Sequence, residues 1–379
     1  MLEPAAAFFY VRVERRLGSG RPAQQLLPIL IRARDRVMHN DYDGVPAPKD
    51  DAMSSYLTDR CIAIGASWGG VTAIMRLVAE LPADIPVPVF IVQHIGAHAS
   101  QLDALIDRQG PNPAKFPAHG ERIQAGTIYV APPDRHMLVD KDTIMLDPGP
   151  KENHARPSID PLFRSVALAY RERAAGVILT GMLDDGTAGL KAIKDCGGIA
   201  VVQDPADAEQ ADMPRSAIAN VEVDHIVPLA GMGALLGTLA QSRPGGQTVN
   251  VPDHVRREHA MTLGQSIIEN LTTIAHPSAL TCPDCGGALF ELNDTRPMRY
   301  RCHVGHAFTL ESLANVQADT AEVFLWAALR SLTEKSLIIR RMAEALPHGD
   351  TAQAEQALRE ADRLSAVCEQ LRGLVQKST

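Results

Sequence analysis

Short apolar runs alternate with helical patterns between residues 59 and 241, and this alternation limits the fold more than any other feature of the sequence. Runs rich in Val and Ile predict strands at 62–64, 87–93, 127–130, 176–180, 199–203 and 225–227. Helical spacing predicts helices at 71–79, 100–109, 161–173, 187–196, 214–219 and 232–239. Strands joined by helices form βαβ units. We therefore expect an α/β fold with a doubly wound, mostly parallel, Rossmann-like sheet.

Smaller features refine this prediction. Residues 137–146 have the pattern of a hairpin that turns at 140–142. Asp160 is the expected N-cap of the helix at 161–173, and Pro161 is expected at its first position.

The chain of 379 residues exceeds one ordinary domain, and its composition predicts five parts. Residues 1–58 lack sustained periodicity, so we expect a disordered or loosely ordered segment there. The α/β domain at 59–241 precedes a linker and helix at 242–279, in which the helix covers 259–275. A small cysteine-rich module follows at 280–309. Two apolar stripes separated by a Pro-Gly break then predict a helical hairpin at 310–379.

Charge and composition exclude several function classes. The net charge is −8 and aromatic residues make up only 4% of the chain, which disfavours a general nucleic-acid or anionic-membrane binder. No run approaches the ~20 apolar residues of a membrane helix, and the first residues lack the basic leading region of a signal peptide. Three of the six cysteines cluster and three are scattered, which disfavours a disulfide framework. We therefore expect a cytoplasmic protein without membrane insertion.

Polar side chains follow three of the predicted strands. Ser67 lies in the turn of CIAIGASWGG, between a strand and a helix, as in a nucleophile elbow. His94 directly follows the second strand, and a carboxylate of the pair Asp184-Asp185 follows the strand at 176–180. Functional residues of open parallel sheets lie beyond the carboxyl ends of the strands, so these three side chains are expected at one edge. A serine hydroxyl needs a neighbouring base, and a carboxylate orients that base, so the set predicts a serine esterase triad.

Each of these residues also has a structural interpretation. The glycine-rich turn resembles a phosphate cradle, His94 ends a strand as an ordinary polar residue, and Asp184 or Asp185 caps the helix at 187–196. The other histidines that compete as bases do not directly end a strongly apolar strand; they are His98, His119, His136 and His154. The conjunction of three matching strand ends favours the catalytic interpretation. The chain order Ser, His, Asp differs from that of ordinary α/β-hydrolases.

Five motifs occur in an order typical of one family. They are GASWGG, the pair Gln93-His94, RPSID at 156–160, LTGMLDDGTAGL from Leu179, and MPRSAI from Met213. Over residues 61–240 the sequence resembles the catalytic domain of the chemotaxis protein-glutamate methylesterase (CheB-type) family. The resemblance implies hydrolysis of glutamyl methyl esters on the cytoplasmic helices of methylated chemoreceptors, and often glutamine deamidation.

Residue by residue, the resemblance places the catalytic serine, histidine and aspartate of the family on Ser67, His94 and Asp185. The backbone N–H of Met182 is expected in the oxyanion hole. Two positions depart from the family pattern: Trp68 stands where a small residue is common, and Leu183 replaces a usual glycine. Trp68 is expected to reshape the substrate groove, which keeps open a related esterase outside chemotaxis. A phosphate- or nucleotide-binding module is the further alternative.

Family members typically carry an N-terminal receiver domain, and about 58 residues are too few for one. We therefore expect a constitutive enzyme, or regulation by a separate protein or by the C-terminal half.

The cysteine cluster has the spacing of a zinc site. Cys282 and Cys285 form a CxxC knuckle, and Cys302 is followed by His306. Two such turns supply four ligands to a closed tetrahedral site, which is structural rather than catalytic. His303 competes as the fourth ligand, but its adjacency to Cys302 makes joint ligation strained. A nucleic-acid-binding ribbon and a redox CxxC are less favoured alternatives. We expect Zn²⁺ here and no cofactor in catalysis.

Overall fold

The computed structural model describes residues 60–242, 249–346 and 351–378. The predicted loose segment at 1–58 and the expected turn of the C-terminal hairpin at 347–350 lie outside these residues. Within the three described ranges, no helix combines the length and apolar character required to cross a membrane.

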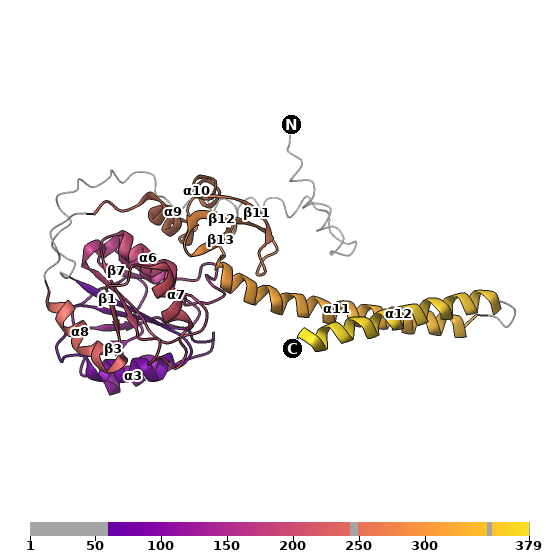
Figure 1. Cartoon of the computed structure of the whole chain (residues 1–379), viewed down its shortest axis with the longest axis horizontal. Coiled ribbons are helices and arrows are strands. Elements are labelled where there is room, and N and C mark those ends of the chain that lie inside the picture. The colour runs from indigo at the N-terminus through magenta and orange to yellow at the C-terminus, as the bar shows by residue number, and fades with distance from the viewer. Residues whose placement is uncertain (1–59, 243–248, 347–350, 379) are drawn as a thin grey trace, which may run out of the picture. The chain divides into compact units, whose positions relative to one another are not determined.

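A seven-stranded sheet forms the centre of the N-terminal domain (Figure 1), and all its strand pairs are parallel. From one edge to the other it contains β10 (His225–Val227), β9 (Ile199–Gln203), β8 (Ala174–Ile178), β1 (Cys61–Ala66), β2 (Val89–Gln93), β5 (Ile128–Val130) and β3 (Ala114–Lys115). The predicted α/β fold with a mostly parallel sheet is confirmed. After β1 the chain adds strands on one side, and β8 returns to the other side of β1, so the strand order reverses at β1.

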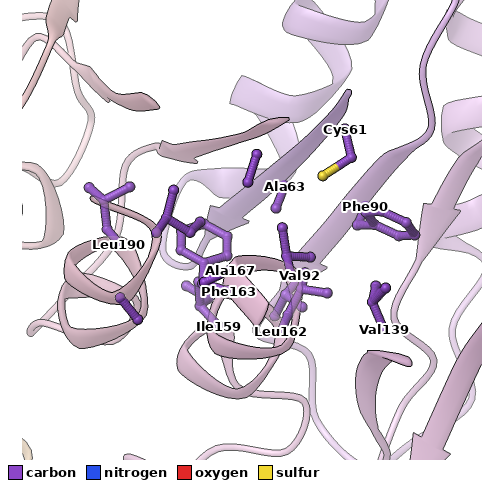
Figure 2. Close-up of a cluster of buried hydrophobic side chains, with 14 of the residues drawn as sticks. Cys61, Ala63, Phe90, Val92, Val139, Ile159, Leu162, Phe163, Ala167 and Leu190 are labelled. Carbon is purple, nitrogen blue, oxygen red and sulfur yellow. The ribbon is translucent and has the colours of Figure 1, made fainter. Parts of the chain in front are cut away.

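Helices cover both faces of this sheet because its strands alternate their apolar side chains between the faces. Ile62 and Ile64 contact one layer, and Cys61 and Ala63 contact the other. The first layer contains α3 (Gly70–Glu80), α4 (Leu102–Gln109) and α8 (Leu229–Gln241). The second contains α5 (Ile159–Tyr170), α6 (Thr187–Asp195) and α7 (Asp212–Asn220), and a 3-10 turn at Arg171–Arg173 follows α5. Figure 2 shows the core between β1, β2 and this second layer.

The start of α5 differs from the prediction. Ser158 is the N-cap and the helix begins at Ile159, so Asp160 lies inside the first turn. Asp160 is buried, and it accepts a hydrogen bond from the backbone N–H of Gly189 at 2.6 Å. Its carboxylate therefore joins α5 to α6 instead of capping its own helix.

A three-stranded antiparallel sheet is formed by strands that lie between β3 and α5 in the sequence. It contains β4 (Glu121–Arg122), β7 (Thr143–Asp147) and β6 (His136–Asp140). The pairing of β6 with β7 confirms the predicted hairpin.

The region after the α/β domain contains two short helices where one was expected. They are α9 (Asp253–Thr262) and α10 (Ile267–Ile274). The helix breaks between them because Gly264 and Ser266 have left-handed backbones, with φ of 73° and 44°. The chain then becomes strand at Ala275, inside the predicted helix.

A four-stranded antiparallel sheet and two long helices complete the chain. The sheet contains β11 (Ala275–Thr281), β12 (Ala288–Thr295), β13 (Met298–Cys302) and β14 (Ala307–Thr309). The helices α11 (Leu310–Glu344) and α12 (Thr351–Ser378) pack together, with Ser336 Oγ donating to the carbonyl of Ala361 at 3.0 Å. We refer to residues 253–378 as the C-terminal extension.

Candidate active site

Ser67, His94 and Asp185 lie together at the carboxyl edge of the central sheet. The His94 Nδ1 atom is 3.0 Å from Ser67 Oγ, and His94 Nε2 is 2.7 Å from Asp185 Oδ2. The three residues follow β1, β2 and β8, which are neighbours in the sheet. Their proximity results from parallel pairing, because parallel strands bring their carboxyl ends to the same edge.

The turn around Ser67 requires glycine. Gly69 has a φ of 73° and is the N-cap of α3. A Cβ atom at Gly70 would lie 2.1 Å from Gln93 Oε1, and the Gln93 amide donates to the carbonyl of Ser67 at 2.8 Å. The amides of this turn are also used internally, because Ser67 N–H donates to Thr180 O and Gly70 N–H donates to Ser67 O. This internal bonding argues against a phosphate cradle.

Asp185 is held by donors on several segments. It is 3% exposed, and besides His94 it accepts from Ser158 Oγ at 2.9 Å, the Ile159 N–H at 2.7 Å and Asn153 Nδ2 at 2.8 Å. Burial alone would raise its pKa, but the hydrogen bonds and the charge of His94 lower the pKa of Asp185 to about 2. The carboxylate is therefore ionised at neutral pH and oriented toward the imidazole.

The alternative roles of Asp184 and Asp185 as helix caps are wrong. Gly186 is the N-cap of α6, and no side chain caps that helix. Asp184 accepts from Thr309 Oγ1 at 2.6 Å, and burial raises the pKa of Asp184 to about 7. Near neutral pH Asp185 is therefore fully ionised, whereas Asp184 is only partly ionised.

Three of the four histidines that competed with His94 have other partners. His136 is buried and donates from Nε2 to the carbonyl of Pro150. The ring of His119 contacts the backbone of Leu146, and His154 Nδ1 is 3.1 Å from Asp284 Oδ1.

Large apolar side chains surround the serine. Trp68 is 62% exposed and Met182 is 49% exposed. Leu183, which follows Met182, has a φ of 59°, a left-handed backbone that favours glycine. The departure from the family pattern at this position therefore strains the turn next to the site.

Replacing Leu183 separates this backbone strain from side-chain packing. We expect Leu183→Gly protein to have a free energy of unfolding about 1 kcal/mol higher than Leu183→Ala protein, because only glycine adopts the left-handed backbone without a Cβ penalty. Urea unfolding of the two variants measures this difference. An alanine variant that equalled the glycine variant would show that the turn is unstrained.

A pocket of about 420 Å³ opens beside His94. The α/β domain lines it with Lys151, Asn153, His154, Arg156 and Leu183, among others. The remaining wall comes from the first turns of α11, at Ser312, Asn315 and Val316. The helical hairpin that follows the α/β domain in sequence therefore contributes to the site.

Sequence reasoning missed two residues that contact Asp185. Ser158 was part of the quoted motif at 156–160, so the motif itself carried the information. Asn153 lies in a loop without local pattern, and its role depends on partners that are remote in sequence.

The α/β domain matches known proteins. The family model for CheB methylesterase matches residues 62–236. A proposed protein-glutamate methylesterase/protein-glutamine glutaminase of Leptospira interrogans is 42% identical over 183 residues, which are 48% of this chain and 95% of the relative. The chain belongs to the CheB methylesterase family.

A CheB-family relative from Ralstonia nicotianae, named protein-glutamate methylesterase/protein-glutamine glutaminase, is 38% identical over 51% of each chain. The crystal structure of the Thermotoga maritima CheB methylesterase catalytic domain aligns with 48% of this chain and 98% of its own, with 29% identity and a TM-score of 0.46.

The cysteine cluster lies C-terminal to the CheB methylesterase match. The ligand atoms of Cys282, Cys285, Cys302 and His306 all lie within 4.8 Å of one another. The two sulfurs of Cys285 and Cys302 are 3.8 Å apart, and Cys302 Sγ is 3.6 Å from His306 Nδ1. Zn–S bonds of about 2.3 Å and Zn–N bonds of about 2.0 Å give tetrahedral edges of about 3.8 Å and about 3.5 Å. The donor set therefore fits a tetrahedral zinc ion, and it contains His306 rather than His303.

Proposed function

We propose that this chain is a protein-glutamate methylesterase that hydrolyses glutamyl methyl esters of chemoreceptor helices, and that it also deamidates receptor glutamines. The contact of Ser67 with His94, and of His94 with Asp185, carries this proposal. It is supported by the names of the CheB-family relatives and by the position of His94 on the wall of an open pocket.

The proposed reaction uses His94 as the base. Its Nδ1 atom takes the proton from Ser67 Oγ, which attacks the γ-carbonyl of the ester, while the Nε2–H donates to Asp185. His94 then returns the proton to the departing methanol. A water molecule enters, His94 deprotonates it, and the resulting hydroxide attacks the acyl carbonyl. The bond to Ser67 Oγ breaks, His94 returns the proton to that oxygen, and the glutamate side chain is released. In deamidation, ammonia leaves in place of methanol.

We propose the Met182 backbone N–H as an oxyanion donor. The amides of Ser67 and Gly181 already donate to Thr180 O and Gln210 O, so neither can hold the oxyanion. The exposed rings and chains of Trp68 and Met182 suit contact with the apolar face of a receptor helix.

Methanol release from methylated receptor membranes tests the proposed function. The full-length protein is expected to release methanol and to restore the negative charge of the receptor glutamates. Intact ester after prolonged incubation, together with hydrolysis of unrelated methyl esters, would assign the protein to a different esterase class.

We also propose that the cysteine cluster holds a structural Zn²⁺ ion. When bound, the ion would join the two knuckles of the four-stranded sheet. His306 Nε2 lies 3.9 Å from Asp284 Oδ2, a carboxylate position that orients ligand histidines in zinc proteins. None of the six cysteines is in a disulfide, which suits a reducing compartment, so we propose a cytoplasmic location.

Metal analysis tests the zinc site. The purified protein is expected to contain about one zinc per chain, and Cys282→Ser protein close to none, because a structural site needs all four ligands. Inductively coupled plasma mass spectrometry measures the number of zinc ions per chain. Cys368→Ser is the matched control, since Cys368 lies between α11 and α12 near Thr333. Equal zinc in the Cys282 and Cys368 variants would contradict the assignment.

A further inference from the structure

We propose that Asn153 is a positioning residue for Asp185, and that the C-terminal extension holds Asn153 in place. Through Thr309 and Ser312, the extension, which lies beyond the CheB-family match, then helps to position the carboxylate of the proposed triad. This inference rests on the proposed function.

The Asn153 side chain is saturated with hydrogen bonds. Its amide nitrogen donates to Asp185 Oδ1 at 2.8 Å and to Asp160 Oδ2 at 2.9 Å. Its oxygen accepts from the Thr309 N–H at 3.0 Å and from Ser312 Oγ at 3.1 Å. An amide group has two donors and two acceptor sites, so every one is used and the orientation is fixed. A rotated amide would place its oxygen against two carboxyl groups.

Both groups that donate to the Asn153 oxygen belong to the extension. Thr309 ends β14 and is the N-cap of α11, where its hydroxyl accepts from the Ser312 N–H. The same hydroxyl donates to Asp184, next to the catalytic carboxylate. The first residues of α11 therefore contact Asn153 and Asp184, both of which lie next to Asp185. A shift of the N-terminus of α11 would move these two neighbours of Asp185.

The backbone of the Asn153 loop is also fastened to the extension. The Asn153 N–H donates to the carbonyl of Ala307 at 2.8 Å, and the Ala307 N–H donates to the carbonyl of Lys151 at 3.3 Å. Glu152, between them, lies in a buried ionic cluster with Arg301 of β13 and Arg164 of α5. The loop is therefore paired with β14 along its backbone and anchored by a buried charge.

Point variants in the full-length chain test this inference. Asn153→Gly removes the amide and tolerates the φ of 51° at this position, whereas alanine would add strain. Thr309→Val removes the hydroxyl contacts to Asp184 and to the Ser312 N–H, which fix the start of α11 where it holds Asn153, and Thr309→Ser restores them. Thr320→Val is the matched control, because Thr320 Oγ1 donates only within α11, to the carbonyl of Val316.

Three measurements apply to each variant. The first is the rate at which a serine-reactive fluorophosphonate labels Ser67. The second is kcat and KM for methanol release. The third is the proton NMR resonance of the His94 Nε2–H, which reports the hydrogen bond to Asp185 without any substrate.

We expect Asn153→Gly and Thr309→Val to lower the labelling rate and kcat by about 10-fold to 100-fold, with KM unchanged, because a small displacement of a catalytic group has effects of this size. The His94 resonance should move upfield or broaden in both variants. Thr309→Ser and Thr320→Val should match the wild type. A fully structured Asn153→Gly protein with wild-type labelling and an unmoved His94 resonance would overturn the inference.

The labelling and NMR measurements test the positioning role of Asn153 separately from the proposed esterase function. Wild-type protein that is not labelled at Ser67 would contradict the esterase assignment. The His94 resonance would still decide whether Asn153 and Thr309 position Asp185.

Discussion

Ser67→Ala protein is expected to lose ester hydrolysis by about four to six orders of magnitude in kcat, with little change in substrate binding. Ser67 Oγ lies 3.0 Å from His94 Nδ1 and is the nucleophile that forms the acyl-enzyme in the proposed mechanism. Without it the base has no nucleophile to activate, and the remaining rate comes from binding and oxyanion contacts alone. Methanol release at saturating substrate measures the change.

Thr72→Ala is the control for this variant. Thr72 carries an exposed hydroxyl in the first turns of α3, close in sequence to Ser67. Its replacement should leave kcat within about two-fold of wild type, as for most surface substitutions. Substantial esterase activity in Ser67→Ala protein would remove Ser67 from the mechanism.

Glu258→Gln is expected to lower the free energy of unfolding by about 3–5 kcal/mol, the usual effect of removing one partner from a buried ionic cluster. Both Glu258 oxygens accept from Arg299 at 2.7 Å, and Arg164 and Arg301 lie at 3.2 and 3.3 Å. Glutamine keeps the shape but removes the negative charge that pairs with Arg164, Arg299 and Arg301. Urea unfolding measures the difference, and Glu344→Ala, at an exposed position of α11, is the control.

Acid should weaken the same cluster. Burial would raise the pKa of Glu152, but Arg164 and Arg301 lower it from 4.5 to about 2, and the pKa of Glu258 is lowered in the same way. A depressed pKa stabilises the fold above the unfolded value and loses this contribution as pH falls. Wild-type stability should therefore fall between pH 4.5 and about 2, and Glu258→Gln should fall less steeply. Parallel slopes for the two proteins would contradict the ionised state of Glu258.

The proximity of Ser67, His94 and Asp185 was predictable because parallel strands obey one geometric rule. An apolar run of Val and Ile identifies a buried strand, and the polar residues that follow it lie near the carboxyl edge. His94 and Asp185 are 91 residues apart in sequence, yet this rule places them at the same edge, and the family motif distinguishes Asp185 from Asp184. The cluster of Cys282, Cys285, Cys302 and His306 was predictable for a different reason, since local spacing places two of these residues in each of two knuckles.

The contacts of Asn153 were not predictable in this way. Asn153 and Thr309 are 156 residues apart and neither ends an apolar strand of the central sheet. The pairing depends on how the extension packs on the α/β domain, and Glu152 and Arg301 appear in the sequence as ordinary surface charges. The break between α9 and α10 was missed because the apolar spacing continues through Gly264, while the backbone there turns left-handed.

Because the chain is synthesised from its N-terminus, the hydrogen bonds that join Asn153 to the C-terminal extension form later than the α/β domain. A ribosome completes β1, β2, β8 and the residues of the triad well before it adds Thr309 and Ser312. A nascent chain that has released only its α/β domain lacks both groups that donate to the Asn153 oxygen, the Thr309 N–H and the Ser312 hydroxyl. On this arrangement the contacts that orient Asn153 beside Asp185 are complete only after the first turn of α11 has left the ribosome.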